Sequence, residues 1–214
     1  MMPTSTMLSS TVPALKTNLP ILTYNPINLK GGWHFGWALD YHTVSSQYIA
    51  EDEFATVRTE VGEALYQLKY KGDYKQINAL AETAAAFIRE RGLYCCLDAI
   101  IPVPPSNLDR YLQPVYEIAF SIGKSLKLPV LIELIIKTKI TSELKDIESK
   151  IIRKSELIGA FIVNDKSFCG KNLLLFDDLY RSGDTLNEIS KALLNQGEVR
   201  KVYVLTLTKT RSKR

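Results

Sequence analysis

The segment "KNLLLFDDLYRSGDTLNEISKALLNQGEVRKVYVLTL", residues 171–207, decides the fold. It begins with an apolar run that predicts a buried strand, and this run leads directly into two adjacent carboxylates, Asp177 and Asp178. A short polar turn follows, and apolar residues then recur at helical spacing until Gly197, a residue type that commonly follows a helix. The closing run "KVYVLTL" predicts another buried strand. A strand, a helix and a second strand in this order are typical of a parallel α/β sheet.

The same alternation continues upstream of this segment. Apolar runs bounded by prolines and polar stretches predict further strands, and amphipathic stripes between them predict helices. The expected strands cover residues 97–103, 129–136 and 157–163, and the expected helices cover residues 61–68, residues 77–88 before Gly92, and a segment that starts at Pro114. We therefore predict a mostly parallel, doubly wound α/β sheet, in which ligands bind beyond the carboxyl ends of the strands.

The N-terminal part of the chain has a different composition. Residues 1–20 are polar and rich in serine and threonine, and we expect a loose tail there. Residues 21–60 are aromatic and β-branched with turn-like glycines, so we expect a small β-rich subdomain ahead of an α/β domain at residues 61–214. Trp33 and Trp37 in this subdomain fit core packing, and they also fit a hood that stacks on a base.

Overall composition bounds the class of protein. The chain has 214 residues, of which 46% are hydrophobic and 23% charged, and this is enough for a substantial core. Its formal net charge of +4 suits an anionic small molecule and is too small to indicate nucleic-acid binding. No apolar run is long enough to span a bilayer, and the N-terminus lacks the pattern of a signal peptide, so we expect no membrane partner.

The cysteines indicate the redox compartment. Cys95 and Cys96 are adjacent, Cys169 stands alone, and no C-x-x-C pair occurs, so neither a disulfide framework nor a structural zinc site is indicated. We therefore expect buried thiols in a reducing compartment, and we place the chain in the cytoplasm.

The turn "RSGDT" contains the parts of a monophosphate cradle. Gly183 can adopt positive φ, so that backbone N–H groups converge, and Ser182 and Thr185 add hydroxyl donors. Arg181 adds a permanent cation, and the N-terminus of the following helix, capped by Asp184 or Thr185, directs its dipole at the same place. The same residues also fit an ordinary capped turn, and the two interpretations are compatible.

The two aspartates lie a few residues before this cradle. Ionised carboxylates accept hydrogen bonds, so they suit the vicinal hydroxyl groups of a ribose. As hard oxygen ligands, Asp177 and Asp178 could also engage Mg²⁺, directly or through water. A diol-binding acidic pair next to a phosphate cradle describes a site for a ribose 5-phosphate, whereas the alternative is an acidic turn exposed at the edge of the sheet.

Four stretches together resemble the ComF-type family, which has the type I phosphoribosyltransferase fold and is related to competence proteins and amidophosphoribosyltransferases. The apolar run, "DD" and "RSGDT" resemble the signature that binds phosphoribosyl pyrophosphate (PRPP). The other three are "ALYQLKYKGD" (residues 64–73), "DAIIPVPPS" (98–106) and "RKSELIGAF" (153–161). The resemblance extends from residue 64 to residue 208 and implies a type I phosphoribosyltransferase-like α/β fold.

The resemblance also implies roles for individual residues. The ribose hydroxyl groups of PRPP would be bound by Asp177 and Asp178. The 5-phosphate would lie on Arg181, Ser182, Gly183, Asp184 and Thr185. The loop that faces the pyrophosphate would be formed by Pro104, Pro105 and Ser106. The catalytic cations, on a mobile loop, would be Lys137, Lys139, Lys145 and Arg153. The lysine-rich stretch at residues 137–154 equally fits a solvated charged helix.

The reaction implied by the resemblance is displacement of pyrophosphate from C1 of PRPP by a nitrogen nucleophile, with Mg²⁺ as cofactor. The expected partners are PRPP, an acceptor that the sequence does not identify, a second copy of the chain, and competence or DNA-processing proteins. The alternative function is a non-catalytic protein on the same fold, which senses PRPP or a nucleotide or assists DNA uptake.

The sequence departs from the family pattern in three places. "RSGDT" stands where "TTGaT" is usual, so that Arg181 adds a charge and Asp184 subtracts one near the phosphate. "RYLQPV" at residues 110–115 replaces "RGfNqa", and the N-terminal cysteine cluster for zinc is missing. These differences concern the acceptor and the turnover step more than the binding of PRPP.

Overall fold

Strand β8 (Asn172–Tyr180) lies at the centre of the fold and contains the apolar run that begins the deciding segment. The computed structural model describes residues 20–50, 53–105, 112–138 and 156–211, with the side chains of residues 47–54 excepted. The other strands are β1 (Ile27–Asn28), β2 (Phe35–Tyr41), β3 (Thr43–Ala50), β4 (Glu53–Arg58), β5 (Ala99–Pro102), β6 (Ile135–Lys137), β7 (Phe161–Val163) and β9 (Lys201–Lys209). The helices are α1 (Glu60–Lys71), α2 (Gln76–Glu90), the short 3₁₀ helix η1 (Leu93–Cys95), α3 (Pro114–Leu126) and α5 (Asp184–Asn195).

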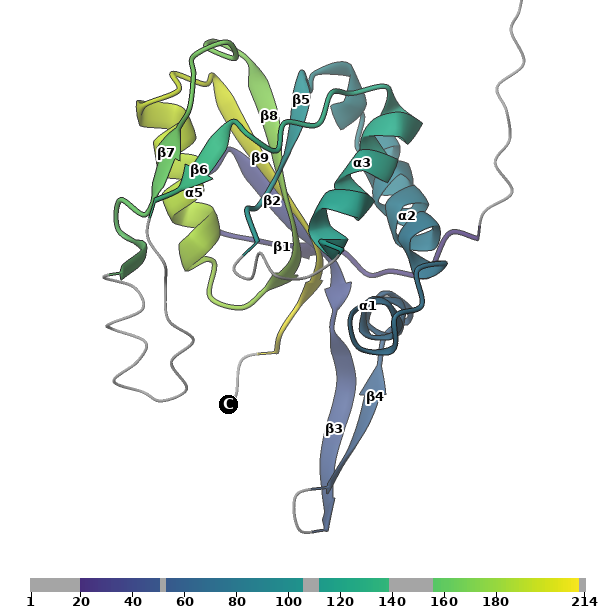
Figure 1. Cartoon of the computed structure of the whole chain (residues 1–214). Helices are drawn as coiled ribbons and strands as arrows, with labels where there is room; N and C mark the ends of the chain where they lie inside the picture. The colour runs from purple at the N-terminus through teal and green to yellow at the C-terminus, as the bar shows by residue number, and fades with distance from the viewer. Residues whose placement is uncertain (1–19, 51–52, 106–111, 139–155, 212–214) are drawn as a thin grey trace, which may run out of the picture.

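The main sheet has five strands in the order β1-β2-β9-β8-β5 (Figure 1). Strands β2, β9, β8 and β5 run parallel to one another, and only β1 is antiparallel to its neighbour. The fold is therefore α/β with a mixed, mostly parallel sheet, as the alternation of strands and helices predicted.

Both faces of the sheet are covered, so the sheet is doubly wound. Side chains alternate across a strand, and along β8 Leu174 and Phe176 belong to the core under α1, α2 and α3. Leu173 and Leu175 belong to the opposite core, which contains the buried face of α5. Burial on both faces explains why β8 has a continuous apolar run instead of alternating polarity.

The aromatic segment expected to form a separate N-terminal subdomain is divided between two places. Strand β2 is part of the main sheet, where it pairs along its length with β9, from Phe35 opposite Tyr203 to Tyr41 opposite Lys209. The expected domain boundary at residue 61 would therefore separate β1 and β2 from the other strands of the same sheet. Partners in a parallel pair are distant in sequence, so local composition could not reveal this pairing.

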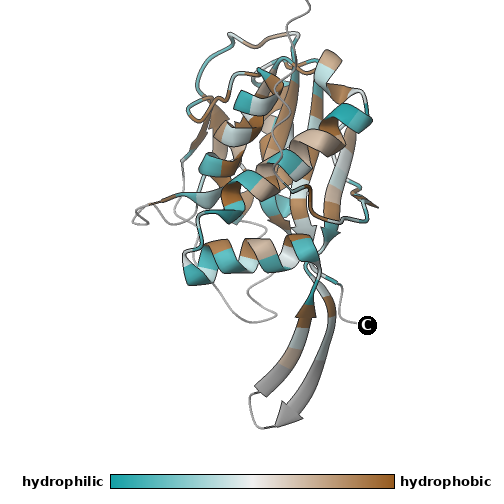
Figure 2. Ribbon diagram, turned by 90° about the vertical axis from the view of Figure 1, so that its right-hand side faces the viewer, coloured by the Kyte–Doolittle hydropathy of each residue, from teal (hydrophilic) through white to brown (hydrophobic). Residues whose placement is uncertain are grey.

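The second half of that segment forms a β-hairpin outside the sheet. Strands β3 and β4 pair antiparallel with each other in a two-stranded sheet of their own. The hairpin extends away from the body of the molecule, beyond the C-terminal end of β2 (Figures 1 and 2). Val44 and Val57, near its base, are exposed.

The predicted strands at residues 129–136 and 157–163 are shorter than expected. Only Ile135–Lys137 and Phe161–Val163 are extended, and they pair antiparallel as β6 and β7, apart from the main sheet. Val130 makes a single parallel bridge to Ile100 at the outer edge of β5. The apolar residues outside β6 and β7 are explained by burial and not by strand pairing. Leu134 and Leu157, for example, pack in the same core as the buried face of α5.

Three further expectations concern burial and the chain ends. All three cysteines are free, as expected, but they are exposed and not buried, because Cys95 and Cys96 lie in or beside the turn η1 and Cys169 lies in the turn before β8. The expected tail lies almost entirely outside the described residues. No helix in the described part of the chain combines the length and the apolar character needed to cross a bilayer.

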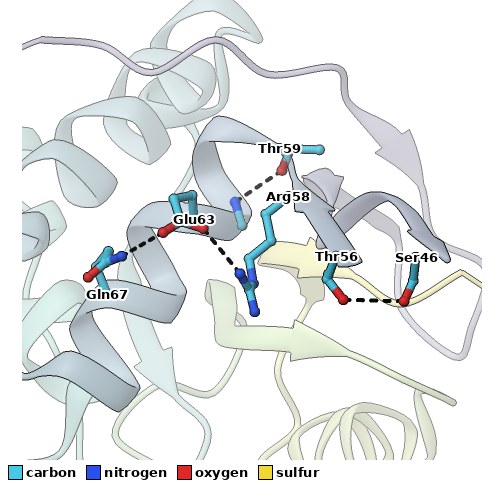
Figure 3. A network of polar contacts seen from close by, with 7 residues as sticks. Ser46, Thr56, Arg58, Thr59, Glu63 and Gln67 are labelled. Carbon is cyan, nitrogen blue, oxygen red and sulfur yellow. Dashed lines mark hydrogen bonds and ion pairs between the residues drawn. The ribbon is translucent and has the colours of Figure 1, made fainter. Parts of the chain in front are cut away.

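Helix α1 is fixed firmly at its N-terminus (Figure 3). The Thr59 hydroxyl oxygen accepts a hydrogen bond from the backbone N–H of Gly62 at 3.0 Å, and the hydroxyl donates to the carbonyl of Tyr41 at 2.6 Å. Arg58, at the end of the hairpin, forms an ion pair with Glu63 on the first turn at 3.3 Å. The helix is thereby tied both to the end of β2 and to the hairpin.

A glycine allows this close approach, and its replacement is a test of the packing. A Cβ atom at Gly62 would lie 2.1 Å from the carbonyl oxygen of His42, so Gly62→Ala should displace the helix. Alanine normally favours a helix by about 1 kcal/mol over glycine. Here we expect a net loss of about 1–3 kcal/mol, the range for overpacking, measured as a lower Tm in thermal unfolding.

Gly32→Ala is the matched control for this experiment. Its Cβ would lie 3.5 Å from the side-chain oxygen of Asn187, an ordinary contact, so the Tm should stay close to that of the wild type. Equal unfolding temperatures for Gly62→Ala and the wild type would contradict the packing described for α1.

Candidate functional site

The candidate site lies where β8 extends beyond the end of its neighbour β5. Pairing with β5 ends at Phe176, whose carbonyl accepts a hydrogen bond from Val103 at 2.8 Å. Pairing with β9 on the other edge continues through Asp177 and ends at Tyr180. The two aspartates thus lie within the strand, and not after its end as the sequence suggested, on a stretch that has a strand on one side only.

A cleft of about 400 Å³ occupies the open side. This volume falls in the range of small-molecule sites in proteins. The cleft lies beyond the carboxyl ends of β5 and β8 and beside the first residues of α3 and α5, as expected for a sheet of this kind. Its charged and polar lining includes Lys69, Tyr70, Gln113, Tyr116, Lys137, Asp177, Asp178, Tyr180, Arg181, Ser182, Asp184 and Thr185.

The turn after β8 has the backbone conformation predicted for a cradle. Gly183 has φ 82°, and a Cβ atom there would lie 2.6 Å from the hydroxyl oxygen of Tyr180, so the position needs glycine twice over. Gly183 is also the N-cap of α5 and no side chain caps the helix, so the expectation of a cap from Asp184 or Thr185 was wrong. Asp184 is the first residue of the helix instead. The backbone amides of the first turn therefore remain available at the cleft.

A side-chain bridge holds this turn in place. The side-chain amide of Asn187 donates a hydrogen bond to the carbonyl of Gly183 at 3.0 Å, and its oxygen accepts one from the backbone of Gly32 at 2.7 Å. The cradle is thus attached to the loop before β2. A backbone fixed from two sides can keep its N–H groups aligned before a ligand arrives.

One member of the acidic pair, Asp178, forms an ion pair with a lysine from helix α1. The ammonium nitrogen of Lys69 lies 2.7 Å from Oδ2 of Asp178, and the exposed fractions of the two side chains are 21% and 11%. Asp177 accepts a hydrogen bond from the backbone N–H of Asp178 at 2.9 Å. Burial, and then the negative charge of Asp178, raise the pKa of the Asp177 carboxyl to about 8.

Thr208 and His42 form hydrogen-bonded contacts next to the backbone of the acidic pair. The hydroxyl of Thr208 on β9 lies 3.3 Å from the carbonyl oxygen of Asp178, to which it donates, and 3.3 Å from Nδ1 of His42. Burial, and then the positive charges of Arg58 and Lys69, lower the pKa of His42 and favour its neutral form. His42 does not line the cleft, so it acts as a structural residue here.

The structure brings most of the described candidate residues together. Pro104, Pro105 and Lys137 line the cleft with the acidic pair and the cradle. Candidates that lie outside the described residues are Ser106, Lys139, Lys145 and Arg153. Trp33 and Trp37 are buried, with exposed fractions of 8% and 7%, and they contribute to the core, not to a hood over the cleft.

Lys69 is the residue of the candidate site that sequence reasoning missed. It lies in "ALYQLKYKGD", a stretch that contributed to the resemblance without being assigned a role. The only local signal was a lysine at the end of a helix whose other face is apolar. Its partner is 109 residues away, so the pairing could not be read from sequence spacing.

The residues present do not fit a divalent ion bound directly to the acidic pair. Asp178 already has a cationic partner, and Asp177 has a raised pKa, which disfavours the charged form that a metal needs. The described residues contain no group of three or more His, Cys, Asp or Glu side chains that could hold a metal. Contact through water or through a ligand's phosphate oxygens is still compatible with this arrangement.

The raised pKa of Asp177 predicts that this residue destabilises the unliganded protein at neutral pH. The folded state binds the proton more tightly than the unfolded state, where the carboxyl has its usual pKa of 3.8, so stability falls as pH rises from about 4 to about 8. Asp177→Asn removes this cost. We expect its Tm to exceed that of the wild type by at least about 2 °C at pH 8 and to converge with it near pH 4.

Asp165→Asn is the control with the opposite sign. Hydrogen bonds from Ser167 lower the pKa of the exposed Asp165 carboxyl, so removing its charge should leave the Tm unchanged or slightly lower at pH 8. The measurements are made in EDTA without phosphate, so that neither cation nor anion occupies the cleft. A Tm for Asp177→Asn at or below that of the wild type across this range would contradict the assignment.

Comparisons with known proteins give matches among solved structures only. No protein-family model matches the sequence, and neither does any curated protein. A hypothetical protein from Neisseria gonorrhoeae with bound ppGpp is 17% identical, with a TM-score of 0.43, over 66% of this chain and 71% of that one. Adenine phosphoribosyltransferase from Saccharomyces cerevisiae is 11% identical, with a TM-score of 0.43, over 76% and 83% of the two chains.

Adenine phosphoribosyltransferase from Thermoanaerobacter pseudethanolicus is 13% identical, with a TM-score of 0.37, over 78% of this chain and 95% of that one. At such identities and TM-scores these likenesses assign neither a family nor an activity to the chain. The function has to be inferred from the cleft itself.

Proposed function

We propose that the protein binds PRPP in the cleft and transfers its phosphoribosyl group to a nitrogen nucleophile. The observation that carries this proposal is the placement of two features in one cleft, the acidic pair on β8 and the glycine-bearing cradle that follows it. Two adjacent carboxyl groups offer acceptor oxygens to a sugar diol whether or not Asp177 is protonated, and a helix N-terminus with a fixed turn suits a phosphate monoester. The ComF-type resemblance of the sequence supports the same ligand.

The proposed ligand has a definite orientation in the cleft. Its 5-phosphate would accept hydrogen bonds from the backbone of residues 182–185, with Arg181 at the exposed rim. Its ribose hydroxyl groups would donate to Asp177 and Asp178, and its pyrophosphate would face Pro104 and Pro105 at the end of β5. Each of these described residues lines the cleft.

The chemical step is a substitution at the anomeric carbon. The lone pair of the acceptor nitrogen forms a bond to C1 while the bond from C1 to the pyrophosphate oxygen breaks, and pyrophosphate leaves with that electron pair. The nitrogen then loses a proton to water. The protein's part is to position the reactants and to neutralise the charge that grows on the leaving group, for which Lys137 is the described candidate.

In this proposal Mg²⁺ arrives with the substrate. Magnesium keeps several waters and is commonly bound through substrate phosphates with few protein ligands, so the complex of Mg²⁺ with the pyrophosphate of PRPP needs no dedicated metal cage. We also propose that the protein works in the cytoplasm, where its three free, exposed cysteines would stay reduced.

Titration calorimetry with PRPP and Mg²⁺ tests the binding half. We expect saturable heat for the wild type and a loss of affinity of at least about tenfold for Gly183→Ala, whose Cβ would meet the Tyr180 hydroxyl. Lys191→Ala is the control, because Lys191 is exposed on the same helix, α5, and does not line the cleft. Absence of heat with the wild type would refute the proposal.

A pyrophosphate-release assay tests the transfer half. The acceptors to screen are nucleobases, ammonia and glutamine, each with PRPP and Mg²⁺. Release that depends on an acceptor and is lost in Gly183→Ala supports a phosphoribosyltransferase. Binding without release for every acceptor would favour the non-catalytic alternative, a protein that senses PRPP or assists DNA uptake.

A further inference from the structure

The ion pair between Lys69 and Asp178 carries an inference about what the acidic pair can bind. The two side chains come from different layers, the lysine from helix α1 and the aspartate from strand β8. Their charged atoms are 2.7 Å apart and both side chains are mostly buried, so this is not a solvent-exposed surface contact. The charge of Asp178 is therefore balanced before any ligand enters the cleft.

The lysine is held at this position by the packing of its helix. Gly62 lies against the carbonyl of His42, so α1 is in close contact with the end of β2. Arg58, at the hairpin base, donates to Glu63 on the first turn of the helix at 3.3 Å (Figure 3). Gln67, one turn further along the same helix, donates to the other oxygen of that carboxylate at 2.6 Å and holds it in place. A lysine on a helix fixed in this way keeps its ammonium group near Asp178 without the help of a ligand.

A divalent ion bound directly to Asp178 would compete with this ammonium group. Both would have to lie within a few ångströms of the same carboxylate, where two cations repel each other strongly because the site is only partly solvated. Lys69 engages Oδ2, and among the described residues no hydrogen bond is made to Oδ1. Within the described part of the chain this oxygen has no donor and is available as an acceptor, which suits a hydroxyl group better than a metal that needs several oxygen ligands.

We propose that Lys69 takes the place of a divalent cation at the acidic pair, excluding a directly bound metal from Asp178 and leaving Oδ1 for a hydroxyl group of a sugar. Lys69 is a positioning residue in this proposal, since it acts through Asp178. The exclusion of metal stands on the ion pair alone. The assignment of Oδ1 to a sugar hydroxyl rests on the proposed function.

Mn²⁺ titration followed by electron paramagnetic resonance tests the exclusion, in the absence of any phosphate ligand. Wild type should bind Mn²⁺ only weakly, and Lys69→Met should bind it at least about tenfold more tightly, because the carboxylate loses its built-in cation. The double variant Lys69→Met/Asp178→Asn should return to weak binding. Lys71→Met is the matched control, an exposed lysine on the last turn of the same helix, and it should behave as the wild type.

Two results would overturn the exclusion: tight Mn²⁺ binding by the wild type, or no gain in Lys69→Met. Should Lys69→Met not fold, the wild type alone decides. Its Tm should not respond to millimolar Mg²⁺ without ligand, whereas a clear rise in Tm would show that the metal already binds.

Calorimetry with ribose 5-phosphate tests the hydroxyl assignment. This ligand lacks the pyrophosphate that would carry Mg²⁺, so wild type should bind it with equal affinity in EDTA and in Mg²⁺. An affinity that requires Mg²⁺ would overturn the assignment. If ribose 5-phosphate does not bind under either condition, the hydroxyl assignment fails, whereas the titration with PRPP still decides the proposed function and the Mn²⁺ titration still decides the exclusion of metal.

Discussion

The unequal pairing of the two edges of β8 is the constraint on which the site depends. One edge is paired with β9 as far as Tyr180, and the other loses β5 at Phe176. Without that mismatch both edges of the stretch that carries the acidic pair would be paired, and β5 would occupy the side where the cleft now lies. Because β9 pairs with β8 as far as Tyr180, the backbone of the acidic pair is held in place. Its other edge has no paired strand beyond Phe176 and faces the cleft.

Helix α1 gives this edge its electrostatic character. Burial, and then the negative charge of the adjacent Asp178, raise the pKa of the Asp177 carboxyl. Lys69 offsets the charge of Asp178 through an ion pair of 2.7 Å. The helix that supplies the lysine is in turn fixed by Gly62 and by the hairpin residue Arg58, so elements outside the main sheet determine the charge at its edge.

Local patterns predicted the elements well and their partners poorly. The apolar run before Asp177, the positive φ of Gly183 and the end of α2 before Gly92 are all local features, decided by neighbours in the chain. The addition of β2 to the main sheet and the contact of Lys69 with Asp178 join residues far apart in sequence, so no periodicity could reveal them. The turn with positive φ at Gly183 was foreseeable because strand, turn and helix are consecutive.

The place of β9 in the sheet has a consequence for the order of assembly. In the order β1-β2-β9-β8-β5, β9 is the middle strand, yet it follows every other described strand in the sequence. During synthesis β2 and β8 therefore emerge from the ribosome before the strand that joins them. Until β9 arrives, β2 and β8 each lack the strand that pairs with both of them, and the stretch of β8 that carries the acidic pair has no partner along either edge.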